Sequence, residues 1–145
     1  MKVGIMKLND TAIIPTMASC DAAGADLYAN IPNESVTIAP GETRFIPTGL
    51  VMMIPKQYGG FIYARSGLAC KQGLRPANCV GVIDSDYRGE IIVAIHNDSA
   101  MPRVITHGNR IAQIVISPCA KPEFEEMNIQ NDTERGKGGF GHTGT

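Results

Sequence analysis

The 145-residue sequence lacks an excess of charge of either sign, since 13 Lys and Arg residues and 14 Asp and Glu residues give a net charge of −1. Duplex nucleic acid is bound chiefly by a basic face, so this balance argues against a nucleic-acid-binding protein, although a local cluster of cations suffices for one nucleotide. No stretch approaches the ~20 apolar residues of a membrane-spanning helix, and the N-terminal residues have no signal-peptide core. We therefore expect a cytoplasmic protein that does not associate with membranes.

Closely spaced cysteine and histidine ligands for a metal ion are also lacking. The four cysteines form no CxxC pair, and the three histidines have no zinc-ligand spacing. We expect the thiols to be reduced and buried as small apolar groups. A domain of this length can bury roughly 68–70% of its unfolded surface, so it needs neither a disulfide nor a metal ion to fold.

Short apolar runs, most of them rich in Val and Ile, are bounded by Gly, Pro, Asn or Asp. The runs are 43–46, 50–54, 60–63, 80–83, 91–95 and 110–116. They are too short for helices and predict an all-β fold, a jelly-roll-like β-sandwich or barrel. One short helix is expected, with Ser66 as its cap, residues 67–72 as its body and Gly73 ending it in the left-handed conformation.

The last twelve residues differ in composition from the rest of the chain. Residues 134–145 contain five glycines and a single large apolar residue, Phe140, and cannot bury a core. We therefore predict a β domain over residues 1–133 and a flexible C-terminal arm over 134–145.

Two segments carry candidate chemistry near the middle of the chain. Arg65, Ser66 and Gly67 lie where the helix should begin, and could bind an anion; a capped helix with a surface arginine is the alternative. Residues 81–91 form an apolar run, a polar turn and a second apolar run, which predicts a β-hairpin. Asp84 lies at the inner end of that turn and could orient a water molecule and take its proton; the alternative is a turn aspartate that bonds its own backbone.

Two further segments lie nearer the ends of the chain. Asp26, among small residues, could face a hydrated Mg²⁺, or could simply begin a strand. Residues 136–141 match G-x-G-x-x-G, but no helix follows for a dinucleotide-binding fold, and Gly138 stands where a Walker A motif has Ser or Thr. Arg135, Thr143 and the glycine amides could wrap phosphates while Phe140 stacks on a base; a tail without function is the alternative.

Taken in order, these segments resemble the five motifs of the dUTPase family of homotrimeric deoxyuridine triphosphatases. The matching segments are AGADLYA, ARSGLACKQG, NCVGVIDSDYRGEI, GNRIAQIVI and RGKGGFGHTGT, and FIPTGL before the second also fits. The resemblance implies a jelly-roll-like subunit, and a homotrimer with three active sites that are each shared between subunits. It also implies hydrolysis of dUTP to dUMP and pyrophosphate, which lowers dUTP and supplies dUMP for thymidylate synthesis.

The resemblance further implies an in-line attack of water on the α-phosphate. By matching position, Asp84 would activate the water, and Asp26 would reach through water a Mg²⁺ ion held mainly by the triphosphate. The same matching assigns the substrate-binding residues as Arg65, Ser66, Gly67, Asn78, Val82, Ile83, Tyr87, Ile92, Gln113, Arg135, Phe140, Gly141 and Thr143.

Within that set, each part of the substrate has its own residues. Asn78 and the 82–84 backbone would line the uracil and deoxyribose pocket, with Ile92 nearby and Tyr87 under the sugar. Arg65, Ser66 and Gly67 would hold phosphates, and Gln113 would support the water and phosphate site. The arm residues Arg135, Phe140, Gly141 and Thr143 would close over the substrate from another subunit.

Two alternatives stay open beside this reading. A dCTP deaminase of the same superfamily would release ammonia instead of pyrophosphate; the glycine-rich aromatic tail and the ARSGLA and VIDSDYRG segments favour the dUTPase. A nucleotide-gated regulatory protein would use the fold to contact a partner; the complete set of expected catalytic residues argues against a purely binding role.

Overall fold

The computed structural model describes residues 1–128, 133–137 and 139, and over these residues the chain is almost entirely β-structure with one short helix. The strands are β1 (Gly4–Lys7), β2 (Thr16–Met17), β3 (Ala25–Tyr28), β4 (Ser35–Ile38), β5 (Thr43–Pro47), β6 (Leu50–Met53), β7 (Tyr58–Tyr63), β8 (Leu74–Pro76), β9 (Gly81–Ile83), β10 (Ile92–Asn97), β11 (Arg103–Thr106) and β12 (Arg110–Pro118). The helix α1 spans Ser66–Gln72. The predicted all-β fold class is confirmed.

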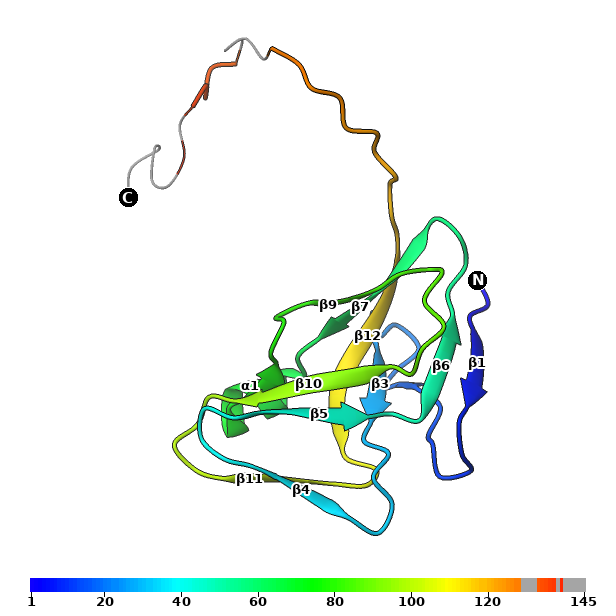
Figure 1. Ribbon diagram of the computed structural model, residues 1–145, viewed down its shortest axis with the longest axis vertical. Coiled ribbons are helices and arrows are strands. Elements are labelled where there is room, and N and C mark those ends of the chain that lie inside the picture. Colours follow the sequence, from blue (N-terminus) through cyan, green and yellow to red (C-terminus); the bar gives the residue numbers. More distant parts are fainter. Residues whose placement is uncertain (129–132, 138, 140–145) are drawn as a thin grey trace.

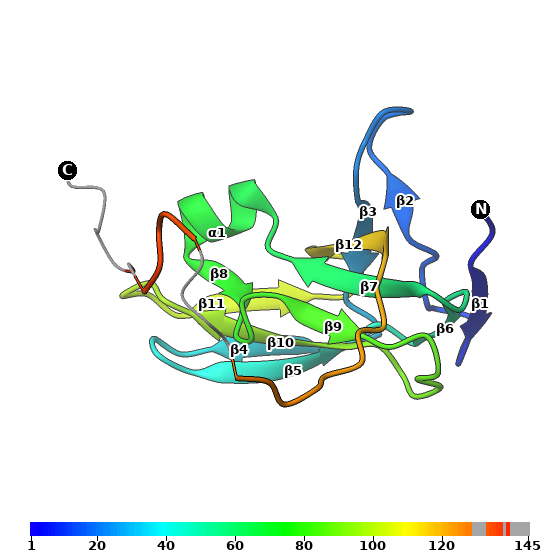
Figure 2. The same ribbon diagram turned by 90° about the horizontal axis from the view of Figure 1, so that it is seen from above.

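The strands form four antiparallel sheets packed as a sandwich (Figure 1). The largest has the order β2-β3-β12-β7-β9, and a three-stranded sheet has the order β5-β10-β8. The pairs β1-β6 and β4-β11 complete the arrangement. In Figure 2 β7 and β12 lie on one side, over the layer that contains β4, β5 and β10. The described strands therefore form separate packed sheets and not one closed barrel.

Aliphatic side chains on alternating strand positions fill the space between the sheets. In β10 Val93 and Ile95 are buried, while Ile92 at the start of the strand is 46% exposed. This is the period of two that is typical of half-buried strands. The fully buried side chains with the largest volumes include Leu27, Ile38, Ile46, Leu50, Leu74, Ile91, Ile95 and Ile111. This β-branched, aliphatic core is what the Val- and Ile-rich runs predict.

The helix ends as predicted but begins one residue earlier. Gly73 has φ +70° and donates its N–H to the Ala69 carbonyl oxygen at 3.0 Å, so its left-handed role is confirmed. Arg65, with extended backbone, is the N-cap residue, and it makes no capping bond through its side chain. The prediction that Ser66 caps the helix is wrong, because Ser66 already has helical geometry and forms the first turn.

The predicted hairpin at residues 81–91 is wrong. Strand β9 pairs with β7, whereas β10 pairs with β5 and β8, so the two apolar runs belong to different sheets. Ile91, which follows the turn, donates its N–H to Leu50 O at 2.8 Å, and this bond attaches it to the start of β6. A turn flanked by apolar runs indicates that two strands follow each other, but it does not specify the partner of each strand.

The cysteines are also more accessible than expected. All four thiols are free, but Cys20, Cys70 and Cys79 are exposed and Cys119 is half-buried, so the prediction of buried thiols is wrong. Aliphatic side chains fill the core instead. No helix among the described residues is long and apolar enough to cross a membrane.

Candidate active site

The first cluster of candidate residues lies where three neighbouring strands meet the start of the helix. Strand β12 lies between β3 and β7, and the register places Gln113 opposite both Asp26 and Tyr63. Arg65 lies two residues after the end of β7, and its side chain reaches Asp26 at the same place. The structure thus brings together Asp26, Arg65 and Gln113, which lie far apart in the sequence.

Asp26 is the centre of this cluster and is only 2% exposed. Its Oδ1 accepts hydrogen bonds from Arg65 Nε at 2.8 Å and from Gln113 Nε2 at 3.4 Å. Its Oδ2 accepts one from Arg110 Nη1 at 3.3 Å. A buried carboxylate is stable only when charge and hydrogen bonds compensate it, so this arrangement holds both guanidinium groups in place.

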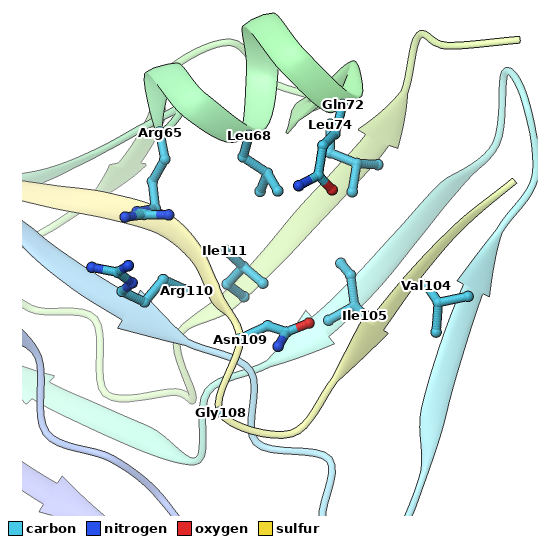
Figure 3. A pocket seen from close by; sticks show the side chains of 10 residues that line it. All are labelled: Arg65, Leu68, Gln72, Leu74, Val104, Ile105, Gly108, Asn109, Arg110 and Ile111. Carbon is cyan, nitrogen blue, oxygen red and sulfur yellow. The ribbon is translucent and has the colours of Figure 1, made fainter. Parts of the chain in front are cut away.

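A cavity of about 340 Å³ opens beside these two arginines, between α1 and the start of β12 (Figure 3). Figure 3 shows Arg65 and Arg110 on the same side of the cavity, with Leu68 and Gln72 of the helix above Ile111 and Ile105. Ser66 is exposed to solvent, as is the neighbouring Gly67. Two fixed cations and an exposed helix start give this place the chemistry of an anion-binding site.

Arg110 is the member of this cluster that sequence reasoning missed. It lies within the GNRIAQ segment, three residues before Gln113, but no local feature links it to Asp26, which is 84 positions away. The register between β3 and β12, with its irregularity between Arg110 and Ala112, brings the two together. The signal available in the sequence was only the position of Arg110 inside a matched segment.

The second cluster surrounds Asp84, which follows β9 directly. A cavity of about 160 Å³ is lined by Val82, Ile83, Asp84, Tyr87, Glu90 and Ile92. Within the turn, Tyr87 donates its backbone N–H to the Asp84 carbonyl oxygen at 3.1 Å, and Asp84 itself is exposed. The turn is therefore closed by the backbone of Asp84 and not by its carboxylate.

Strand β9 also presents an open edge to this cavity. It is the last strand of its sheet, paired with β7 on one side only. An edge strand offers backbone N–H and C=O groups to another partner. Asn78 lies close by, since a Cβ on Gly81 would be 3.2 Å from Asn78 Nδ2. The backbone of β9 and the ring of Tyr87 therefore lie around one small cavity, and the Asn78 amide lies beside the first residue of the strand that borders it.

The two clusters lie at opposite ends of β7. Ile83 pairs with Gly60, so Asp84 comes next to Gly59, and both line a second, larger cavity. Arg65 lies six residues beyond Gly59 along an extended segment, which corresponds to about 20 Å at ~3.3 Å per residue. The Arg65 cavity contains no residue of the Asp84 cavity, and the reverse also holds.

The C-terminal candidates are only partly within the described residues. Residues 119–128 leave the β domain as an extended segment (Figure 1), and Arg135 is described and exposed. Phe140, Gly141 and Thr143 lie outside the described residues. Their roles, and the boundary between residues 133 and 134, stay predictions.

Comparisons with known proteins agree on one family. A family model described as dUTPase matches residues 10–144. The deoxyuridine 5'-triphosphate nucleotidohydrolase of Desulfitobacterium hafniense is 47% identical over 145 residues, which covers 99% of this chain and 95% of that protein. The corresponding protein of Roseobacter denitrificans is 46% identical over 136 residues, which covers 93% of this chain and 90% of that protein.

Solved structures show the same fold. A mutant of the Staphylococcus bacteriophage 80alpha dUTPase with dUpNHpp superposes with a TM-score of 0.89 at 27% identity over 99% of both chains. A mutant dUTPase of the S. aureus phage phi11, described with a structural Mg(II) ion, superposes with a TM-score of 0.81 at 23% identity over 91% of this chain. At that lower identity the second comparison shows the fold alone.

Proposed function

The chain belongs to the dUTPase family, and we propose that it hydrolyses dUTP to dUMP and pyrophosphate with Asp84 as the general base. The observation that carries the proposal is the exposed Asp84 carboxylate at the rim of a cavity of about 160 Å³, beside the open edge of β9. A fixed carboxylate at such a place can orient a water molecule and accept its proton.

Each active site is proposed to combine residues of different subunits in a homotrimer. The α-phosphate of dUTP is linked to the β-phosphate through a single oxygen. The base beside the α-phosphate and an arginine that binds the β- and γ-phosphates must therefore be close neighbours. Asp84 and Arg65 of one chain are separated by about 20 Å of extended strand instead. A cyclic trimer repeats the same contact three times, and each contact can set Asp84 of one subunit against Arg65 of the next.

The reaction is an in-line displacement at the α-phosphorus. The water oxygen forms the new bond to phosphorus, its proton passes to the Asp84 carboxylate, and the bond from the α-phosphorus to the bridging oxygen breaks. Arg65, fixed by Asp26 at 2.8 Å, compensates charge on the phosphates, and Ser66 and Gly67 bind them beside it. In such reactions positioning and charge stabilisation supply most of the rate.

Selection of uracil follows from the edge of β9. Its free N–H and C=O groups, together with Asn78, can pair with the donor and acceptor groups of uracil as a second base would. Cytosine presents the reversed pattern and would leave buried polar groups unpaired, at about 1–3 kcal/mol each. We further propose that the pocket excludes the 5-methyl group of thymine. Tyr87, which lines the same cavity, would lie against the deoxyribose and clash with a ribose 2′-hydroxyl. We therefore expect strong preference for dUTP over dTTP, dCTP and UTP.

Magnesium is proposed as an ion carried by the substrate. The described residues contain no group of three His, Cys, Asp or Glu side chains that could hold a metal. Asp26 is already engaged by Arg65 and Arg110, so it fits contact through water and not direct coordination. Mg²⁺ commonly keeps several waters and binds through substrate phosphates, where it compensates their charge.

One experiment separates the candidate activities and tests the base. Pyrophosphate release from dUTP is measured beside ammonia release from dCTP, with Asp84→Asn and the control Asp86→Asn, an exposed neighbour in the same turn. We expect pyrophosphate from dUTP only. Asp84→Asn should lower turnover about 10²–10⁴-fold while dUTP still binds. Near wild-type turnover in Asp84→Asn would exclude Asp84 as the base, and ammonia release would identify a deaminase.

A further inference from the structure

Tyr87 has an unusually close neighbour in its own turn. A Cβ built on Gly89 would overlap the Tyr87 hydroxyl oxygen and lie 2.6 Å from Cζ and 3.0 Å from Cε2. The ring therefore rests directly on the Gly89 backbone. Gly89 is not among the described glycines with positive φ, so the backbone conformation does not require glycine here. The close approach of the ring is the physical reason for a residue without a side chain.

The hydroxyl end of the same ring is also held. Tyr87 Oη donates a hydrogen bond to the Glu90 carbonyl oxygen at 3.0 Å. Because the Tyr87 side chain is 43% exposed, packing alone would leave it several rotamers. The Gly89 surface and the Glu90 carbonyl together fix the plane of the ring and its position.

Glu90 is itself anchored to the buried part of the fold. Its Oε1 accepts a hydrogen bond from Gly49 N–H at 2.7 Å, in the β5–β6 connection. The next residue, Ile91, donates its N–H to Leu50 O at 2.8 Å and accepts from buried Thr48 Oγ1 at 2.6 Å. The carbonyl that holds Tyr87 thus belongs to a residue fixed on both sides. A chain of contacts leads from the core to the ring.

We propose that Gly89 and Glu90 are positioning residues that set the discrimination between deoxyribose and ribose. The inference rests on the proposed function, which places the sugar against Tyr87 in the cavity that Glu90 and Ile92 also line. A ring held at one position excludes a 2′-hydroxyl by steric contact. A ring free to tilt into solvent makes room for it. The discrimination between deoxyribose and ribose therefore depends on the contacts of Gly89 and Glu90 that hold the ring, as well as on the ring itself.

The direct test is Gly89→Ala in the full-length protein. The added methyl group displaces the ring toward solvent without imposing positive φ, so the fold should survive. Steric selection of this kind is worth roughly 10–200-fold, and we expect the ratio of kcat/KM for dUTP to that for UTP to fall at least about tenfold. The matched control is Gly4→Ala, whose Cβ would press on the side chain of exposed Met53, 2.6 Å from its Cε and 3.3 Å from its Cβ; neither residue lines the cavity. Its ratio should equal that of the wild type.

Three further variants make the result independent of how well Gly89→Ala folds. Tyr87→Phe keeps the ring but loses the bond to the Glu90 carbonyl, so its ratio should fall in the same direction. Glu90→Gln keeps an acceptor for Gly49 N–H and should retain the wild-type ratio, whereas Glu90→Ala should lower it. Calorimetric affinities for dUMP and UMP give the same comparison without turnover.

The outcomes separate this inference from the proposed function. Gly89→Ala or Tyr87→Phe with active dUTP hydrolysis and an unchanged dUTP-to-UTP ratio would overturn the positioning role. A wild-type protein that does not hydrolyse dUTP would overturn the proposed function instead. If kcat/KM for dUTP and for UTP fell by the same factor, so that their ratio were preserved, the positioning role would be overturned and Gly89 and Glu90 would be merely structural.

Discussion

Mixed trimers test whether Asp84 and Arg65 of different subunits form one site. Arg65→Gln and Asp84→Asn are each expected to be nearly inactive. Within one chain the two residues lie at opposite ends of β7, about 20 Å apart. If a site takes Asp84 from one subunit and Arg65 from another, a site in a mixed trimer is intact when the subunit that supplies Asp84 carries Arg65→Gln and the subunit that supplies Arg65 carries Asp84→Asn. Random equal mixing makes about one quarter of the sites intact.

The assay is pyrophosphate release after the two variants are unfolded together, refolded and purified as trimers. Recovery to about one quarter of wild-type turnover is expected, against the low sum of the separate variants. The matched control mixes Arg65→Gln with Asp26→Asn, whose side chains contact each other in the same chain at 2.8 Å, and should recover nothing. If mixed trimers of the first pair form but stay inactive, the shared-site reasoning is refuted.

Three other perturbations test separate parts of the structure. Asp26→Asn removes the anion between Arg65 and Arg110 and should lower the free energy of unfolding by about 1–3 kcal/mol, because charge-assisted bonds to a buried group are lost while both arginines reach solvent. Thermal melting measures the loss, with Asp21→Asn at an exposed site as the control. An unchanged melting midpoint in Asp26→Asn would contradict the prediction. Removal of residues 134–145 should leave a folded trimer with severely reduced dUTP turnover, measured with size-exclusion chromatography; full activity would contradict the role of the arm as a lid. Gly73→Ala should cost about 1–3 kcal/mol, since Gly73 has φ +70° and a Cβ would lie 2.9 Å from Ser99. Gly41→Ala, at φ +74° with no atom within 4 Å of the added Cβ, should cost less, and equal denaturation midpoints would show that the Ser99 contact adds nothing.

Sequence reasoning succeeded where local patterns control the outcome. The short Val- and Ile-rich runs, bounded by turn residues, predicted strands because such runs are too short for helices, and the structure shows the period-two burial of a strand in β10. Gly73 was predicted as the end of the helix because a left-handed residue there favours glycine. Sequence reasoning failed on which strands pair with each other, as in the predicted hairpin at residues 81–91. The residues near a strand in the sequence do not indicate which other strand will form its hydrogen bonds.

The sequence by itself determined which chemical groups are available: a carboxylate at Asp84 after an apolar run, cations at Arg65 and Arg135, and the class of fold that presents them. Only the tertiary structure decided how these groups are arranged. The β3–β12 register set Arg110 against Asp26, and the β7–β9 register set Asp84 at the far end of β7 from Arg65. Both arrangements depend on contacts between residues distant in the chain, which form only when the sheets pair and the core between them is buried.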